Sequence, residues 1–265
     1  MPPPTRLRTR TLALLAAALA AGACASGGGD TVEPLAAADT SRARAHHSVG
    51  ATHLREGRIA LAIRELRAAE QLNPRDKWIQ LGLAEAYRRK SLGADAERHL
   101  KKALVIDPAF QDARLTLSGL YIQSERYPEA IAETQLLIDD PTFPKPWEAL
   151  VNKGYALMLL RRRTEAREAL ELALEYHDRY WRAHLNLGIL DEEEGKRLEA
   201  MERFDRVLKL GAGPLASAEV NYRMAEIYLS LGNRERAVEH LVAASSQRPN
   251  GAWGKRSEDT LRALR

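Results

Sequence analysis

The sequence predicts an all-α protein, built as a solenoid of six antiparallel helix pairs. Two observations lead to this prediction: a small residue recurs at a nearly constant spacing, and helix-breaking residues fall between the recurrences. The intervals are 34, 34, 36, 34 and 37 residues, between Ala62, Ala96, Ala130, Ala166, Ala200 and Ala237. A helix pair of this length cannot bury its apolar face alone, so neighbouring pairs must stack into one continuous core.

The first element in the chain, residues 1–23, has the features of an export signal. Arg6, Arg8 and Arg10 precede a run of 13 residues, Thr11 to Ala23, that is almost wholly Leu and Ala. A bilayer span needs roughly 20 apolar residues, so this run predicts a signal peptide that is removed from the mature protein.

The only cysteine in the chain, Cys24, follows this run directly. The ending Ala-Gly-Ala-Cys resembles a bacterial lipobox, and the resemblance implies that Cys24 is acylated and anchors the mature chain in a membrane. The alternative is an ordinary signal peptide cut near Ala23, which leaves an unpaired thiol. Residues 24–42 are expected to form a flexible tether, because Ala25 to Asp30 are small and polar. Ala25 after the cysteine is similar to an enterobacterial signal for sorting to the outer membrane.

Six repeats are expected between residues 43 and 250, starting near 43, 77, 111, 147, 181 and 218. The first repeat has Gly50, Ala62, Ala69 and Pro74 at positions 8, 20, 27 and 32. Small residues allow the two helices to approach closely, and proline ends the second helix. The pattern resembles the tetratricopeptide repeat, which implies a right-handed superhelical solenoid.

Two junctions interrupt this regularity. Three prolines between Asp139 and Pro146 exclude a continuous helix and predict a stiff corner between repeats three and four. Gly211 to Pro214 predict a second break before repeat six. Both are interpreted as breaks in the repeat structure that have no binding role. For the first, a loop that contacts a partner is the alternative. Residues 251–265 are expected to form a C-terminal tail.

The charge of the chain argues against nucleic acid as a partner. Without the three arginines of the signal, 37 basic residues face 36 acidic ones. The cationic excess that drives non-specific binding to phosphates is therefore missing. The charged runs Arg161–Arg163 and Asp191–Glu194 are expected to be solvated helix ends.

No catalytic residue, cofactor or metal ligand is predicted. The chain contains no phosphate-binding loop, His-Glu-x-x-His pair, Gly-x-Ser-x-Gly elbow or cysteine pair. The histidines are expected on the surface or between helices. A metal site at His46 with His53, or at Asp178 with His184, is the alternative. The protein is therefore expected not to be an enzyme.

Positions 2, 5, 9 and 12 of each first helix are expected to line a groove that binds an amphipathic helix of a protein partner. Two alternatives remain, burial of these side chains between neighbouring repeats and occupation of the groove by the C-terminal tail. The predicted lining is markedly apolar and comprises Trp78, Leu81, Leu115, Ile122, Val151, Tyr155, Met158, Leu185, Ile189 and Tyr222.

The corner between repeats three and four resembles that of a particular protein family. Asp140-Pro141-Thr142-Phe143-Pro144, followed by Ala149, Asn152 and Gly154, resembles the type IV pilus biogenesis pilotins, which are six-repeat outer-membrane lipoproteins. Leu115 to Gly119 lacks the Asn-x-Gly that this family usually has in its third repeat. The resemblance implies a non-catalytic scaffold that binds a secretin subunit and helps it to reach and assemble in the outer membrane. It also implies lipid anchoring there, facing the periplasm.

A second function remains open from the sequence. The alternative is a periplasmic adaptor lipoprotein that presents proteins to peptidoglycan enzymes or envelope proteases. Repeats one, two, five and six do not distinguish the two functions.

Overall fold

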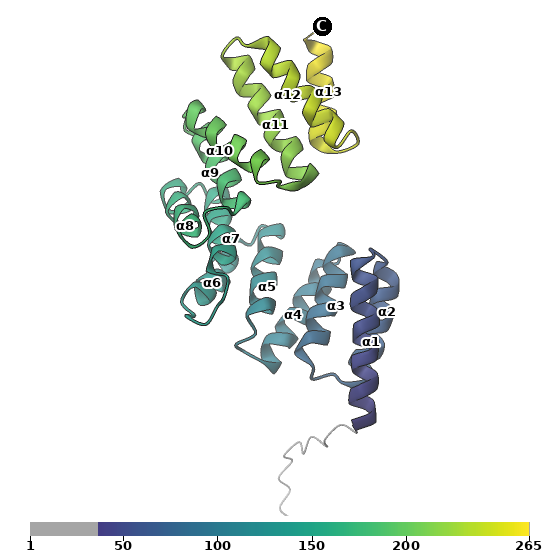
Figure 1. Cartoon of the computed structure of the whole chain (residues 1–265). Helices are drawn as coiled ribbons and strands as arrows, with labels where there is room; N and C mark the ends of the chain where they lie inside the picture. Colours follow the sequence, from purple (N-terminus) through teal and green to yellow (C-terminus); the bar gives the residue numbers. More distant parts are fainter. Residues whose placement is uncertain (1–36, 265) are drawn as a thin grey trace, which may run out of the picture. The chain divides into compact units, whose positions relative to one another are not determined.

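The computed structural model describes residues 37–264, and these residues fold into thirteen α-helices with no strand among them (Figure 1). The expected signal peptide, Cys24 and the first part of the expected tether lie outside the described residues. The helices are α1 (Ala37–Arg55), α2 (Ile59–Leu72), α3 (Lys77–Arg89), α4 (Gly93–Ile106), α5 (Gln111–Gln123), α6 (Tyr127–Ile138), α7 (Pro146–Leu159), α8 (Arg163–Tyr176), α9 (Trp181–Glu193), α10 (Arg197–Lys209), α11 (Gly213–Ser230), α12 (Arg234–Gln247) and α13 (Ala252–Ala263).

The first twelve helices form the six predicted pairs, and each second helix also packs on the first helix of the next pair (Figure 1). The starts of α3, α5 and α9 coincide with the predicted repeat starts at 77, 111 and 181. α1 begins earlier than the predicted 43, at Ala37, so the last residues of the expected tether are helical. α11 begins at Gly213 instead of 218, because Pro214 already has the backbone angle of a first helical turn.

The recurring small residues lie where the paired helices meet. All six alanines of the repeat pattern are fully buried, at 0% exposure. A Cβ atom built on Gly188 would lie 2.6 Å from Cε1 of Phe204, and one on Gly154 would lie 2.7 Å from Cγ of Leu170. The close approach that the sequence predicts therefore exists, and it leaves no room for a side chain at these two glycines.

The corner between repeats three and four is non-helical from Asp139 to Lys145, as predicted, whereas Pro146 opens α7. Phe143 is 7% exposed and packs on Leu137 and Ala149. The Asp140 side chain accepts hydrogen bonds from the backbone N–H of Thr142 at 2.9 Å and from Nε2 of Gln111 at 2.6 Å. An internal aromatic anchor and a capped turn thus hold this corner.

Histidines connect the two helices of several pairs, as expected. Nδ1 of His99 donates to Oε1 of Gln80 at 2.7 Å, and Nδ1 of His240 donates to Oδ1 of Asn221 at 2.8 Å. Each imidazole also stacks on a tyrosine ring, with centroids 5.4 Å apart for His99 and 5.3 Å apart for His240. Repeats two and six therefore each contain the same kind of histidine–amide hydrogen bond between their two helices.

We predict that filling the helix contact destabilises the solenoid. Gly188→Val should lower the free energy of unfolding by about 2 kcal/mol, because the new side chain overlaps the Phe204 ring. Gly119 is the matched control, since a Cβ there meets nothing within 4 Å. Gly119→Ala should raise the free energy of unfolding by up to about 1 kcal/mol. Urea denaturation measures both, and equal effects of the two substitutions would contradict this account of the packing.

We also predict a pH dependence of stability that arises from His99. Burial lowers the pKa of His99 from 6.5 to about 4, although Glu70 pulls in the opposite direction. As the pH falls below 6.5, His99 takes up a proton in the unfolded chain, whereas in the folded chain it stays neutral down to about pH 4. The contribution of neutral, buried His99 to the free energy of unfolding is therefore present above pH 6.5 and is lost as the pH falls towards 4. The loss is at most about 3 kcal/mol.

His99→Gln should reduce the loss of stability between pH 7 and pH 5, measured by urea denaturation at the two pH values. The comparison variant is His47→Gln, because the His47 side chain is partly exposed. If wild type and His99→Gln lose the same free energy of unfolding over this range, the buried imidazole is not the source.

Candidate protein-binding groove

The first helices of repeats four to six border a cavity of about 440 Å³, the groove cavity, which is lined by apolar and by charged side chains. Five of the predicted groove residues lie there together. Its apolar lining consists of Val151, Tyr155, Met158 and Leu159 on α7 and Trp181, Leu185 and Ile189 on α9. The structure thus gathers half of the predicted lining into one concave site.

The side chains of this lining differ in how far they reach solvent. Val151 and Met158 are 4% and 8% exposed, whereas Tyr155 and Leu159 are each 39% exposed. The alternative of burial between repeats is therefore correct for the first two, which form the floor. The exposed aromatic ring and leucine remain free to contact a bound segment.

Charged side chains from α9 and α11 form one edge of the groove cavity. Nη1 of Arg223 donates to Oε2 of Glu192 at 2.7 Å, and its Nη2 donates to Oε1 of Glu219 at 3.1 Å. Burial raises the pKa of Glu192, and the negative charges of Glu226 and Glu193 add to this effect against the pull of Arg223. Carboxylates therefore crowd around one guanidinium at this edge.

The acidic run that ends α9 is only partly solvated, which corrects the sequence-based expectation. Asp191 is 3% exposed and accepts a hydrogen bond from Nη2 of Arg167 at 2.8 Å. Glu193 pairs with Arg161 at 3.3 Å and with Arg163 at 3.2 Å. Consecutive residues of a helix point in different directions, so a charge run does not share one environment.

The early groove residues are arranged differently and lie outside the groove cavity. Trp78 is 47% exposed, with its ring edge-on to Phe110 at 4.7 Å. Leu81 and Ile122 pack against the core of the first repeats, and Leu115 packs against the cluster of Phe143. Among these four, Trp78 offers the most surface to a partner.

The expected C-terminal tail is a helix, α13, which packs against α11 and α12 (Figure 1). Its Trp253 ring lies 5.4 Å from the ring of Tyr222, which was predicted to line the groove. The tail helix thus contacts the predicted groove residue of the last repeat. The five lining residues in repeats four and five remain uncovered by this helix within the part of the chain that the structure describes.

Sequence reasoning missed Trp181, Glu219 and Arg223, which also line the groove cavity. Trp181 and Glu219 stand at positions 1 and 2 of their repeats and Arg223 at position 6, counted from the predicted starts. The rule of four lining positions overlooks Trp181 and Arg223, and the preference for apolar residues set Glu219 aside. The aromatic residue at the first position of repeat five was the sequence signal that could have identified Trp181.

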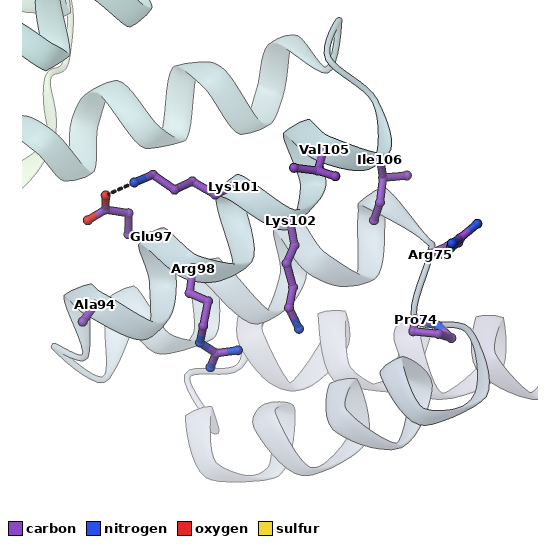
Figure 2. Close-up of a pocket in the computed structure, with 9 residues that line it drawn as sticks. All are labelled: Pro74, Arg75, Ala94, Glu97, Arg98, Lys101, Lys102, Val105 and Ile106. Carbon is purple, nitrogen blue, oxygen red and sulfur yellow. Dashed lines mark ion pairs between the residues drawn. The ribbon is translucent and has the colours of Figure 1, made fainter. Parts of the chain in front are cut away.

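A larger hollow, of about 680 Å³, lies along α4 and is lined by apolar side chains, Val105 and Ile106 among them, together with several charged ones. Figure 2 shows Glu97, Arg98, Lys101 and Lys102 along one side of this helix. Lys101 pairs with Glu97 at 2.7 Å, Lys102 with Glu70 at 3.0 Å and Arg98 with Asp95 at 2.8 Å. Because these cations already have partners and no aromatic ring lines the hollow, we take the groove cavity as the candidate site.

Residues 37–264 were also expected to hold no metal site. No group of three or more His, Cys, Asp or Glu side chains in this range is placed to hold a metal ion. Nε2 of His184 instead donates to the backbone carbonyl of Asp178 at 2.8 Å. In the same range no helix is both long and apolar enough to span a bilayer.

Comparisons with known proteins agree with the fold. Sequence profiles of the tetratricopeptide repeat match residues 50–109, 93–154, 148–176 and 218–250. A stretch of 62 residues is 37% identical to the photosystem I assembly protein Ycf3 of Synechococcus sp. (strain CC9902). This stretch covers 23% of the chain and only 36% of that relative.

Two solved structures resemble nearly the whole described chain. PilF of Pseudomonas aeruginosa superposes with a TM-score of 0.69 at 17% identity, over 84% of this chain and 99% of PilF. PilW, described as a widely conserved type IV pilus biogenesis factor, gives a TM-score of 0.71 at 20% identity, over 80% of this chain and 96% of PilW. At these identities the likeness concerns the fold.

We predict that α13 stabilises the last repeat through Trp253. Trp253→Ala should lower the free energy of unfolding by about 2 kcal/mol, because Trp253 is only partly buried against Tyr222. Tyr176→Ala, at a tyrosine that is 58% exposed, is the control and should cost far less. Hydrogen exchange should show faster opening of α12 and α13 in the Trp253 variant alone. Unchanged exchange in these helices would refute the role of Trp253.

Proposed function

Because the chain is a tetratricopeptide-repeat protein, we propose that it is a non-catalytic scaffold lipoprotein that binds a secretin subunit. In this proposal it assists the outer-membrane localisation and assembly of the secretin in type IV pilus biogenesis. The observation that supports it most is the groove cavity, because its apolar floor and charged edge suit an amphipathic protein segment. The likeness in fold to PilF and PilW over most of the chain is consistent with the proposal.

The anchor completes the proposed mechanism. Acylated Cys24, outside the described residues, would hold the solenoid at the inner face of the outer membrane. Tethering raises the local concentration of a bound subunit at the bilayer, so sorting and assembly follow without a catalytic step.

A crosslinking pull-down from intact envelopes tests the choice of partner. The mature lipoprotein should recover a secretin, and a Cys24→Ser variant should recover less of it. Recovery of peptidoglycan enzymes or envelope proteases without a secretin would contradict the proposal and favour the adaptor function.

We predict that Trp78→Ala weakens secretin multimerisation severalfold while leaving the solenoid folded, because nearly half of the Trp78 surface is exposed, 47%. Tyr155→Ala tests the late repeats in the same way, since Tyr155 is 39% exposed. Leu81→Ala should also reduce multimers, but it costs stability because Leu81 packs on the core. Heat-resistant secretin multimers on gels measure the effect, with circular dichroism as the control for folding.

Wild-type multimer levels in both the Trp78 and the Tyr155 variants would show that neither of these exposed residues binds the secretin. The exposed Tyr176 on α8 provides a comparison outside the groove, and Tyr176→Ala should leave the multimers unchanged.

A further inference from the structure

Polar side chains at one repeat position line the groove cavity on three successive first helices. Asn152, Asn186 and Arg223 each stand at position 6, counted from the predicted repeat starts, and belong to α7, α9 and α11. Arg223 already pairs with Glu192 and Glu219, at 2.7 and 3.1 Å. The hydrogen bonds of the two asparagines therefore decide which uncharged polar groups the cavity can bind.

The side-chain amide of Asn186 has no hydrogen-bond partner within residues 37–264. Asn186 is only 8% exposed, and it lines the groove cavity. The fully enclosed polar atoms that lack a partner in this range belong to histidines, so the Asn186 amide opens into the cavity. Burying an amide without a hydrogen bond costs free energy. A ligand group that pairs with this amide would therefore recover that cost.

Asn152, in the repeat before, offers a hydrogen-bond acceptor. Oγ of Ser118 donates its only proton to the backbone carbonyl of Leu115 at 2.7 Å, so it can only accept from Asn152. Nδ2 of Asn152 donates to this oxygen at 3.0 Å, which fixes the orientation of the amide. Oδ1 of Asn152 accepts no hydrogen bond from the described residues. Two successive repeats thus contribute amide groups with unused hydrogen-bonding capacity.

The charged side chains of the lining already have contacts. Arg161 pairs with Glu193 at 3.3 Å, and Arg223 pairs with Glu219 at 3.1 Å. Arg182 lies over the neighbouring indole ring, with its Cζ 5.4 Å from the ring centroid. A charged ligand would have to compete with these contacts, whereas the asparagine amides can bind a ligand without losing a partner.

An extended peptide segment suits this lining better than a helix does. The interior N–H and C=O groups of a helix bond within the helix, whereas each residue of an extended segment brings a donor and an acceptor that need partners away from water. An asparagine side chain offers both kinds of group and so complements one peptide unit. Alternate side chains of an extended segment point to one side. Apolar residues there can contact Tyr155, Leu159 and Leu185, which line the same cavity.

We propose that the groove cavity binds an extended apolar segment of a protein, and that the Asn186 side chain hydrogen-bonds one peptide group of this segment. Oδ1 of Asn152 would accept from a second backbone N–H. The occupant is thus an extended segment instead of the helix that the sequence predicts. This inference deepens the proposed function and rests on it only in taking the cavity as a protein-binding site.

The stability of the chain without a ligand gives the first test. Asn186→Leu should leave the midpoint of urea denaturation unchanged or raise it, because leucine has a similar shape and needs no partner. Asn221→Leu is the matched control, since Asn221 is 4% exposed and bonds to Ser217 at 2.9 Å and to His240 at 2.8 Å. This control should lower the midpoint by about 1 M. A similar drop for Asn186→Leu would mean that its amide holds the fold, and would overturn the inference.

Binding of designed peptides to the full mature chain gives the second test. Two labelled peptides contain the same Leu, Phe and Ser residues between polar ends. In one the apolar residues alternate with Ser, and in the other they follow the helical period and a side-chain bridge holds the helix. In fluorescence anisotropy the alternating peptide should bind more tightly. Asn186→Leu should weaken the alternating peptide about tenfold and the helical one far less.

Replacing single peptide bonds of the alternating peptide by esters locates the hydrogen bond. An ester removes one backbone N–H, so at the position beside Asn186 it should weaken binding to the wild type severalfold. The same ester should have little effect on binding to Asn186→Leu, because the partner is already absent. Tyr155→Ala should weaken both peptides, since Tyr155 contributes apolar surface to the cavity.

Tighter binding of the helical peptide, an affinity that Asn186→Leu does not change, or no binding of either peptide would each overturn the inference. These outcomes are separate from the partner of the proposed function. A secretin can be recovered from envelopes although the peptides show no preference for the extended form. Conversely, the dependence on Asn186 can hold although the envelope partner is not a secretin.

Discussion

The close approach of the two helices within each pair is the constraint on which the rest of the structure depends. At Gly154 and Gly188 the facing side chain occupies the space of a Cβ atom, and the buried alanines of the second helices are fully covered. Each pair therefore has one packing distance and behaves as a single unit. Stacking such units transmits the geometry from one repeat to the next. The groove cavity is a product of that stacking, because its walls belong to neighbouring pairs.

The same constraint separates the residues that build the fold from those that can contact a partner. In α7, Gly154 faces Leu170 of α8, whereas Tyr155, the next residue and about 100° further round the helix, faces the cavity. A side chain cannot occupy the position of Gly154, because Leu170 of the second helix fills that space. Packing and recognition therefore use different faces of one helix.

The fold could be predicted from the sequence because its signals are local and repeated six times. Small residues at fixed positions and prolines at the ends of second helices identified the pairs, and the corner at Phe143 was found from its prolines. The site was only half predictable. The lining positions on α7 and α9 followed from the helical period. The contact that covers Tyr222 depends on the docking of α13, which the repeat pattern does not predict. Asp191 was misjudged because its partner, Arg167, lies on another helix, 24 positions away in the chain. Contacts between helices decide such cases, and a single repeat does not contain them.

Arg223 connects the two features that the sequence left unexplained, the charged edge of the groove and the C-terminal helix. Its guanidinium binds Glu192 of α9 and Glu219 of α11, and its Cζ lies 5.6 Å from the centroid of the Trp253 ring on α13. One side chain of the last repeat therefore contacts both the preceding repeat and the C-terminal helix at the edge of the groove cavity.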